Sequence, residues 1–118
     1  MSDTNRYRLV TRSDFDGLVC AVLLKQRGII DDISFVHPKD MQDGKIEIGP
    51  RDITTNLPFV PSCHLAFDHH ASEVSRLGAD RPNNLIIDPN SPSAARVVYK
   101  HFGGAEGFPG ISDAMMDA

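Results

Sequence analysis

The chain has 118 residues, of which 41% are hydrophobic and 24% are charged, as expected for one globular domain. Its formal net charge is −4 and it contains no block of basic residues, which argues against duplex nucleic acid held through its phosphates. No apolar run approaches the length of a membrane span, and the N-terminus carries no apolar signal segment. We therefore expect a cytoplasmic protein with no membrane partner.

The first half of the chain alternates patterns typical of strands and helices. Strands are expected over residues 7–11, 33–37, 45–48 and 52–57, with a helix over 17–27 and a short helical turn over 38–43. Gly28 is placed to end the first helix in the left-handed conformation. Apolar residues cover more than one face of that helix, which indicates burial against a sheet and a second layer.

The second half continues the alternation. Strands are expected over 64–68 and 85–88, and a helix over 92–102, with Ser91 as its cap and Pro92 in its first turn. A last helical pattern follows Ser112 and stops at Ala118. The order of elements predicts a three-layer α/β domain with a mostly parallel sheet of about five strands. We expect residues 1–118 to form a single domain that is incomplete at its C-terminus.

The first candidate site is the segment Ser13-Asp14-Phe15-Asp16-Gly17, which follows the first strand. Residues two apart in extended chain face the same side, so Asp14 and Asp16 can converge on one metal ion or on a pair. Gly17 leaves room for close backbone approach at a helix N-terminus, which favours anions. A calcium EF-hand loop is excluded because its glycine would come later. A polar turn that caps a helix is the alternative.

The second candidate site is Asp68-His69-His70, which closes an apolar strand. In open α/β sheets ligands bind beyond the carboxyl ends of the strands, so both motifs are expected at one edge. Hard carboxylate ligands combined with imidazole are typical of a divalent metal centre that handles phosphate. A solvated loop is the alternative for this tripeptide taken alone.

The motif S-D-F-D-G before a buried helix, followed later by F-D-H-H, resembles the DHH phosphoesterase superfamily over nearly the whole chain, in particular its exopolyphosphatase-like branch. The resemblance implies two Mn²⁺ ions, with Mg²⁺ as the alternative. Asp14 would serve the first ion, Asp16 and His69 the second, while His70 faces the substrate phosphate and Asp68 supports the site. A metal-activated hydroxide would attack a phosphoester or phosphoanhydride in a small phosphorylated or short oligonucleotide substrate.

The chain departs from the family pattern in several places. Val10 and Arg12 stand where many members carry a histidine before the paired carboxylates. The family's bridging carboxylate ends the strand before the DHH strand, where this chain has Asn56, while Asp52 begins that strand. Either residue is a candidate ligand. A fourth motif aspartate and the C-terminal substrate-binding domain are also absent, so we expect this chain alone to be nearly inactive and its parent to be a phosphoesterase.

Further polar residues surround the helix expected over 92–102. Ser91, Ser93 and Arg96 are candidates for binding the substrate phosphate, because a helix N-terminus favours anions. The alternative is a turn with a helix cap. The remaining histidines are expected to be satisfied at a strand edge, structural or exposed: His37, His64 and His101.

Two other functions stay open at this point. The segment D-F-D-G-L is similar to the first motif of haloacid-dehalogenase-like phosphatases, in which Asp14 would be a nucleophile. Leu18 stands where that motif usually has threonine. The other alternative is a non-catalytic nucleotide- or phosphate-binding module that has lost metal ligands.

Overall fold

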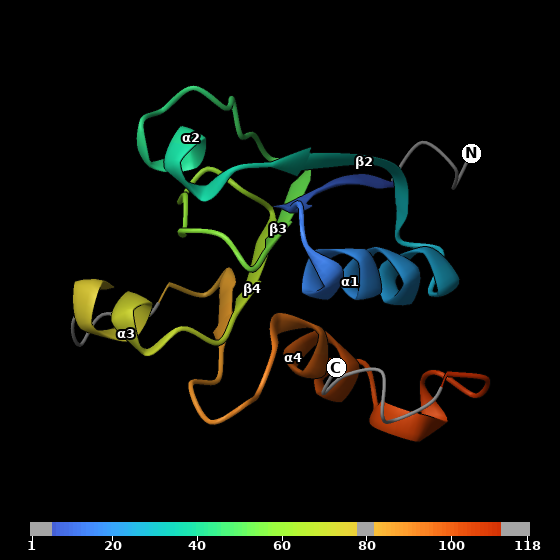
Figure 1. The fold of residues 1–118 in the computed structure, drawn as a ribbon. Helices are drawn as coiled ribbons and strands as arrows, with labels where there is room; N and C mark the ends of the chain where they lie inside the picture. The colour runs from blue at the N-terminus through green and yellow to red at the C-terminus, as the bar shows by residue number, and fades with distance from the viewer. Residues whose placement is uncertain (1–5, 78–81, 112–118) are drawn as a thin grey trace.

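Five strands form one central sheet in the computed structural model, which describes residues 6–77 and 82–111 (Figure 1). They are β1 (Tyr7–Arg12), β2 (Ile30–Val36), β3 (Asp52–Thr55), β4 (Leu65–Asp68) and β5 (Leu85–Ile87). Their order in the sheet is β2-β1-β3-β4-β5, and every neighbouring pair is parallel. The predicted α/β fold with a parallel five-stranded sheet is confirmed.

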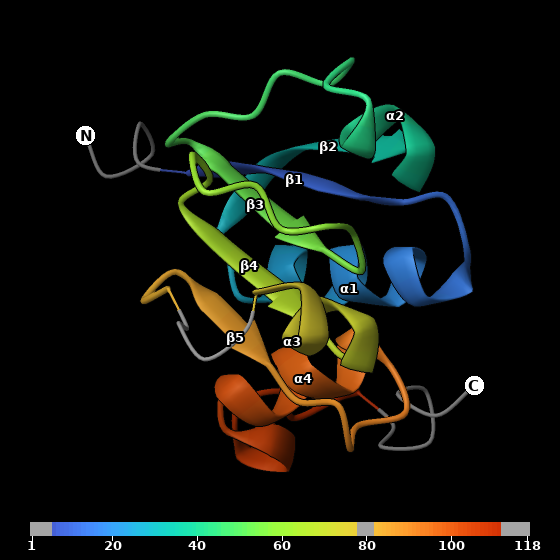
Figure 2. The ribbon, with the colours of Figure 1, turned by 90° about the vertical axis from the view of Figure 1, so that its left-hand side faces the viewer.

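Helices cover both faces of this sheet (Figures 1 and 2). One face carries α1 (Phe15–Gln26) and α4 (Ala94–His101), which pack against each other, and the 3₁₀ turn η2 (Gly104–Glu106) follows α4. The shorter helices α2 (Pro38–Gln42) and α3 (Ala71–Leu77) lie on the other side. The fold therefore has the three layers that the sequence predicts.

Alternation along the strands divides the core into two clusters. Leu9 and Phe67 face α1 and α4, whereas their neighbours Val10 and Ala66 pack on the opposite side with Met41 of α2. All five of these residues are buried. Side chains one residue apart point to opposite faces of a strand, so one short apolar strand serves both layers.

Three element predictions need correction. β2 starts at Ile30 rather than at residue 33, and its exposed Asp31 and Asp32 hid the strand signal. These charges are tolerated because β2 is an edge strand. Residues 45–48 form no strand, although Ile48 is buried in the same core cluster as Val10 and Met41. Helix α3, which directly follows His70, was not predicted at all.

The start of α4 also differs from expectation. Ser93, not Ser91, is its N-cap, and its side chain accepts a hydrogen bond from the Arg96 N–H at 3.0 Å. The end of α1 is as predicted, with Gly28 at φ 71° beyond the helix. The helix expected after Ser112 lies outside the described residues. Over residues 6–77 and 82–111, no helix is long and apolar enough to cross a membrane.

Candidate metal centre

The ends of β1, β3 and β4 lie side by side because these strands are parallel neighbours in the sheet. We call this end of the sheet the carboxyl edge. The chain leaves it at Asp14 after β1, at Asn56 after β3 and at Asp68 to His70 from β4. Segments far apart in sequence thus deliver polar side chains to one place, as expected for an open α/β sheet.

Asp14 is the N-cap of α1 and is surrounded by hydrogen-bond donors. Its Oδ1 accepts from the Gly17 N–H at 2.9 Å. Its Oδ2 lies 3.4 Å from Nε of Arg12 and 3.4 Å from Nδ2 of Asn56. Gly17 permits this turn, since a Cβ there would lie 2.0 Å from the Arg12 carbonyl oxygen. The turn between β1 and α1 therefore requires glycine at position 17.

Asp16 joins the carboxyl edge to the start of α4. Its two carboxylate oxygens accept the N–H groups of Ala94 and Ala95, both at 2.9 Å. These are donors that an α-helix leaves unpaired at its N-terminus, so a carboxylate is favoured there. Oδ1 also accepts from the Cys20 thiol at 3.9 Å, so Oδ2 is the oxygen whose second lone pair can bind a cation.

His69 points its Nε2 atom toward Asp16, 4.0 Å from Oδ2 of that carboxylate. Its other ring nitrogen, Nδ1, lies 3.2 Å from the carbonyl oxygen of Ser91. A carbonyl only accepts hydrogen bonds, so in the neutral ring Nδ1 carries the proton and Nε2 has the lone pair. A backbone carbonyl behind a histidine in this way is the usual support for a metal ligand.

Asp68 is 2% exposed and orients both residues that follow it. Its Oδ1 accepts the His69 N–H at 2.8 Å and lies 2.6 Å from Nδ1 of His70. Potential ligand atoms of Asp68, His69 and His70 all lie within 4.8 Å of one another. The tripeptide therefore forms a compact group with the donor chemistry of a divalent cation site.

Within residues 6–77 and 82–111, two buried oxygen atoms at this edge have no hydrogen-bond partner: Asn56 Oδ1 and Asp68 Oδ2. Buried oxygens without partners are rare and call for an explanation such as an ion. Asn56 is held at φ 60°, a left-handed conformation that asparagine adopts more readily than most residues. The two oxygens and the free lone pair of His69 fit a hard cation.

Asp52 is not brought to this group. It lies at the opposite end of β3, where Arg8 donates to both of its oxygens at 2.9 and 3.0 Å and the Gly49 N–H donates at 2.9 Å. Of the two candidates for the bridging position, only Asn56 reaches the carboxyl edge. Val10 is fully buried in the core below it.

The three residues predicted to bind phosphate near the start of α4 differ in what their side chains contact: Ser91, Ser93 and Arg96. Ser91 is buried, donates its hydroxyl to Asp88 at 3.0 Å, and reaches the site through the carbonyl that contacts His69. Ser93 caps α4. The Arg96 guanidinium lies over the ring of Tyr99, 5.5 Å from its centre. Ser91 contacts the histidine pair through its backbone carbonyl.

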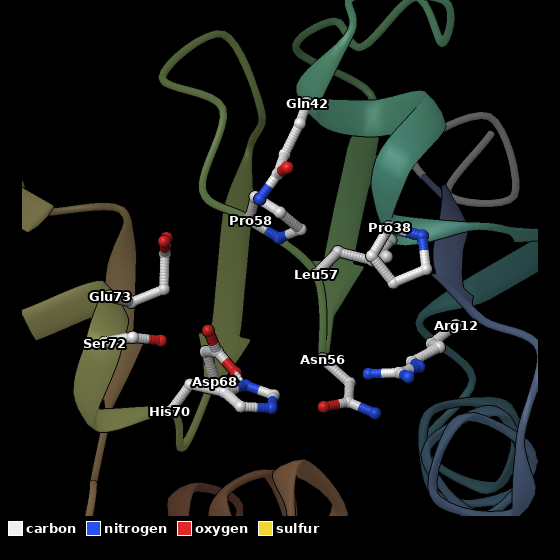
Figure 3. Close-up of a pocket in the computed structure, with 10 residues that line it drawn as sticks. All are labelled: Arg12, Pro38, Gln42, Asn56, Leu57, Pro58, Asp68, His70, Ser72 and Glu73. Atoms are coloured by element: carbon white, nitrogen blue, oxygen red, sulfur yellow. Dashed lines mark hydrogen bonds and ion pairs between the residues drawn. The ribbon is translucent and has the colours of Figure 1, made fainter.

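A pocket of about 150 Å³ opens beside the group (Figure 3). Asp68, His70, Asn56 and Arg12 line its inner end, and α2 and α3 form its walls. From the sequence, Arg12 is only a departure from the ligand pattern of the family. Its place beside Asp14 follows from β1, which ends at Arg12 itself. A guanidinium at this position is suited to contact phosphate oxygens.

A parallel α/β domain with carboxylates and imidazoles gathered at its carboxyl edge is typical of metal-dependent phosphoesterases. No family model and no curated protein matched the chain in the comparisons. A solved structure did: the pGpG-specific phosphodiesterase PggH of Vibrio cholerae, with 61% sequence identity and a TM-score of 0.84. The match covers 95% of this chain and 35% of that protein.

The chain belongs to the DHH phosphoesterase superfamily, as its motifs predicted. The match therefore argues against the alternative that the chain is a haloacid-dehalogenase-like phosphatase. The exopolyphosphatase-like branch stays a prediction, since the matched relative is named for pGpG rather than for polyphosphate. The chain spans about a third of that relative.

Proposed function

We propose that this chain is the catalytic domain of a metal-dependent phosphodiesterase that hydrolyses a short nucleotide substrate. The observation that carries the proposal is the pair of buried, unpartnered oxygens of Asn56 and Asp68 beside the His69–His70 pair. It is supported by 61% identity to a protein named as a phosphodiesterase. In a solvated loop these two oxygens would be exposed and would accept hydrogen bonds from water.

The metal would be held by oxygens and nitrogen of the carboxyl edge. Asp16, Asp68 Oδ2 and His69 Nε2 are the first candidates, with Asn56 Oδ1 and Asp14 completing the set. When bound, a divalent cation would neutralise negative charge on the phosphoryl group and lower the pKa of a water molecule. Mn²⁺ is the expected ion and Mg²⁺ the alternative; the family resemblance implies two ions.

Residues of the pocket would position the phosphate. His70 is oriented by Asp68, and in its protonated form its Nε2–H donates to a phosphate oxygen while Nδ1–H stays bonded to Asp68. The Arg12 side chain, at the same end of the pocket, is 45% exposed and offers further donors. Together they would fix the phosphodiester for attack, which is worth several orders of magnitude in rate.

The name of the relative and the size of the pocket support this substrate class. A pocket of about 150 Å³ suits a phosphoryl group rather than a protein segment. The relative's name makes pGpG the first substrate to test. Hydrolysis of its internal phosphodiester consumes one water and gives two molecules of GMP.

The test uses the 118-residue chain and a chimera in which it replaces the matching part of PggH. Both are freed of metal by a chelator, supplied with Mn²⁺ and assayed for GMP release from pGpG. We expect Mn²⁺-dependent turnover by the chimera and little turnover by the chain alone. A chimera that binds Mn²⁺ and pGpG but releases no GMP would overturn the proposal in favour of a binding module.

A further inference from the structure

A second pocket, of about 370 Å³, opens across the ends of β1 and β2. Its lining includes Arg12, Ser13 and Asp14 from the end of β1, and Phe35, His37 and Pro38 from the end of β2. Pairing of Thr11 with Phe35 in the parallel ladder sets these two segments side by side. Because Arg12 and Pro38 also line the phosphate pocket, the two pockets adjoin.

Phe35 gives this pocket an aromatic wall. Phe35 is 47% exposed, whereas the aliphatic residues of β2 are buried or half-buried. An open aromatic face next to a phosphate site is the arrangement by which proteins stack a nucleobase. Stacking tolerates any base, so a polar group must supply selectivity.

His37 offers that polar group. Its Nδ1 accepts the Lys39 N–H at 3.1 Å as the N-cap of α2. An accepting Nδ1 carries no proton, so in the neutral ring the proton is on Nε2. Across the described part of the chain, Nε2 of His37 has no hydrogen-bond partner. The sequence predicts a satisfied histidine at the strand edge, and this holds for Nδ1 but not for Nε2.

We propose that this second pocket is a nucleobase subsite, in which Phe35 stacks the base and His37 Nε2–H donates to an acceptor on its edge. The inference rests on the proposed phosphodiesterase function and adds base recognition to it. Guanine presents two neighbouring acceptors, N7 and O6, on one edge, where cytosine presents an amino donor. The subsite should therefore favour guanine over cytosine.

The experiment measures KM and kcat of the chimera for pGpG, for pCpC and for an abasic dinucleotide with the same phosphates. Phe35→Ala should raise KM for pGpG roughly 5- to 150-fold, the range that base stacking supports, with kcat nearly unchanged. Phe35→Tyr should retain the wild-type KM, whereas Phe35→Leu should behave like Phe35→Ala. His37→Ala should reduce the preference for pGpG over pCpC.

The abasic substrate and Leu18→Ala provide the controls. Leu18 is 50% exposed on α1 and does not line either pocket. Its substitution should change no KM, and no variant should change KM for the abasic substrate. Equal KM values for wild type and Phe35→Ala with pGpG would overturn the subsite, as would an equal rise for the abasic substrate.

Failure of the phosphodiesterase function is distinguishable from failure of the subsite. If the wild type binds pGpG with Mn²⁺ present but does not cleave it, dissociation constants replace KM and the same comparison of variants decides the subsite. If the wild type neither binds nor cleaves pGpG, both proposals fall.

Discussion

Nδ1 of His70 lies 2.6 Å from Oδ1 of Asp68, while the second oxygen of that carboxylate is buried and finds no hydrogen-bond partner in the part of the chain that the structure describes. One oxygen of Asp68 thus orients the histidine pair, and the other is left for a ligand. Carboxylates that orient a histidine are common in metal sites.

Asp68→Asn separates these two roles. The amide oxygen can keep the bonds to His69 and His70, whereas an NH₂ group replaces the unpartnered oxygen. We expect Mn²⁺ affinity, measured by calorimetry, to fall about 10- to 100-fold with little loss of metal-free stability. The matched control is Asp43→Asn, an exposed residue that ends α2. Unchanged affinity in Asp68→Asn would exclude this oxygen as a ligand.

Asn56→Asp should have the opposite effect on the metal. Aspartate also tolerates the left-handed backbone at this position, and its charge adds to that of the ligand set. We expect roughly tenfold tighter Mn²⁺ binding. The metal-free protein should melt at a lower temperature, because the new carboxylate lies beside Asp14. Asn90→Asp, in an exposed turn, is the control. Weaker Mn²⁺ binding in Asn56→Asp would contradict the placement of Asn56 at the metal.

Gly17→Ala tests the turn that sets the first motif. The added Cβ would lie 2.0 Å from the Arg12 carbonyl oxygen, so β1 and α1 must move apart. We expect the free energy of unfolding, measured with urea, to fall by about 1–3 kcal/mol and Mn²⁺ affinity to fall with it. Gly49→Ala places its Cβ in open space and should change neither quantity. A Gly17→Ala protein with wild-type stability would show that this turn is not tightly packed.

We expect Asp52 to contribute to the pH dependence of the free energy of unfolding and not to catalysis. Burial disfavours its charge, but hydrogen bonds from Arg8 and Gly49 outweigh burial and hold the pKa of its carboxyl below the ordinary 3.8. A lowered pKa stabilises the fold at every pH above 3.8, and that contribution is lost as pH falls through the folded-state pKa. The stability gap between wild type and Asp52→Asn, measured with urea, should therefore be constant near neutrality and shrink below about pH 4. A gap that widens in acid would contradict this assignment.

Much of the scaffold was predictable because local signals agree with the tertiary structure. Gly28 ends α1 where a left-handed residue is needed, and Asp68 closes an apolar strand. Helix α3 was missed because its sequence, ASEVSRL, contains too few apolar positions to show a helical period. The apparent strand at 45–48 has alternating isoleucines but finds no neighbouring strand to pair with in the described sheet.

The sequence predicts which residues form most of the site, but not how these residues contact one another. Strand ends identify Asp14 and the Asp68 tripeptide from sequence alone. The choice between Asn56 and Asp52 depends on which end of β3 meets His69, and the parallel pairing of β3 with β4 shows that it is the end at Asn56. The long-range bonds from Asp16 to the start of α4 carry no local sequence signal.

The central claim is that catalysis takes place at the carboxyl edge, and one measurement tests it most directly. The rate of GMP release from pGpG with saturating Mn²⁺ is compared between two chimeras with the same chemical change, Asp14→Asn and Asp52→Asn. We predict that Asp14→Asn lowers kcat/KM at least about 100-fold, because it removes charge at the metal. Asp52→Asn, at the far end of β3, should remain within a few-fold of wild type. Equal losses in the two proteins, or a larger loss in Asp52→Asn, would contradict the account.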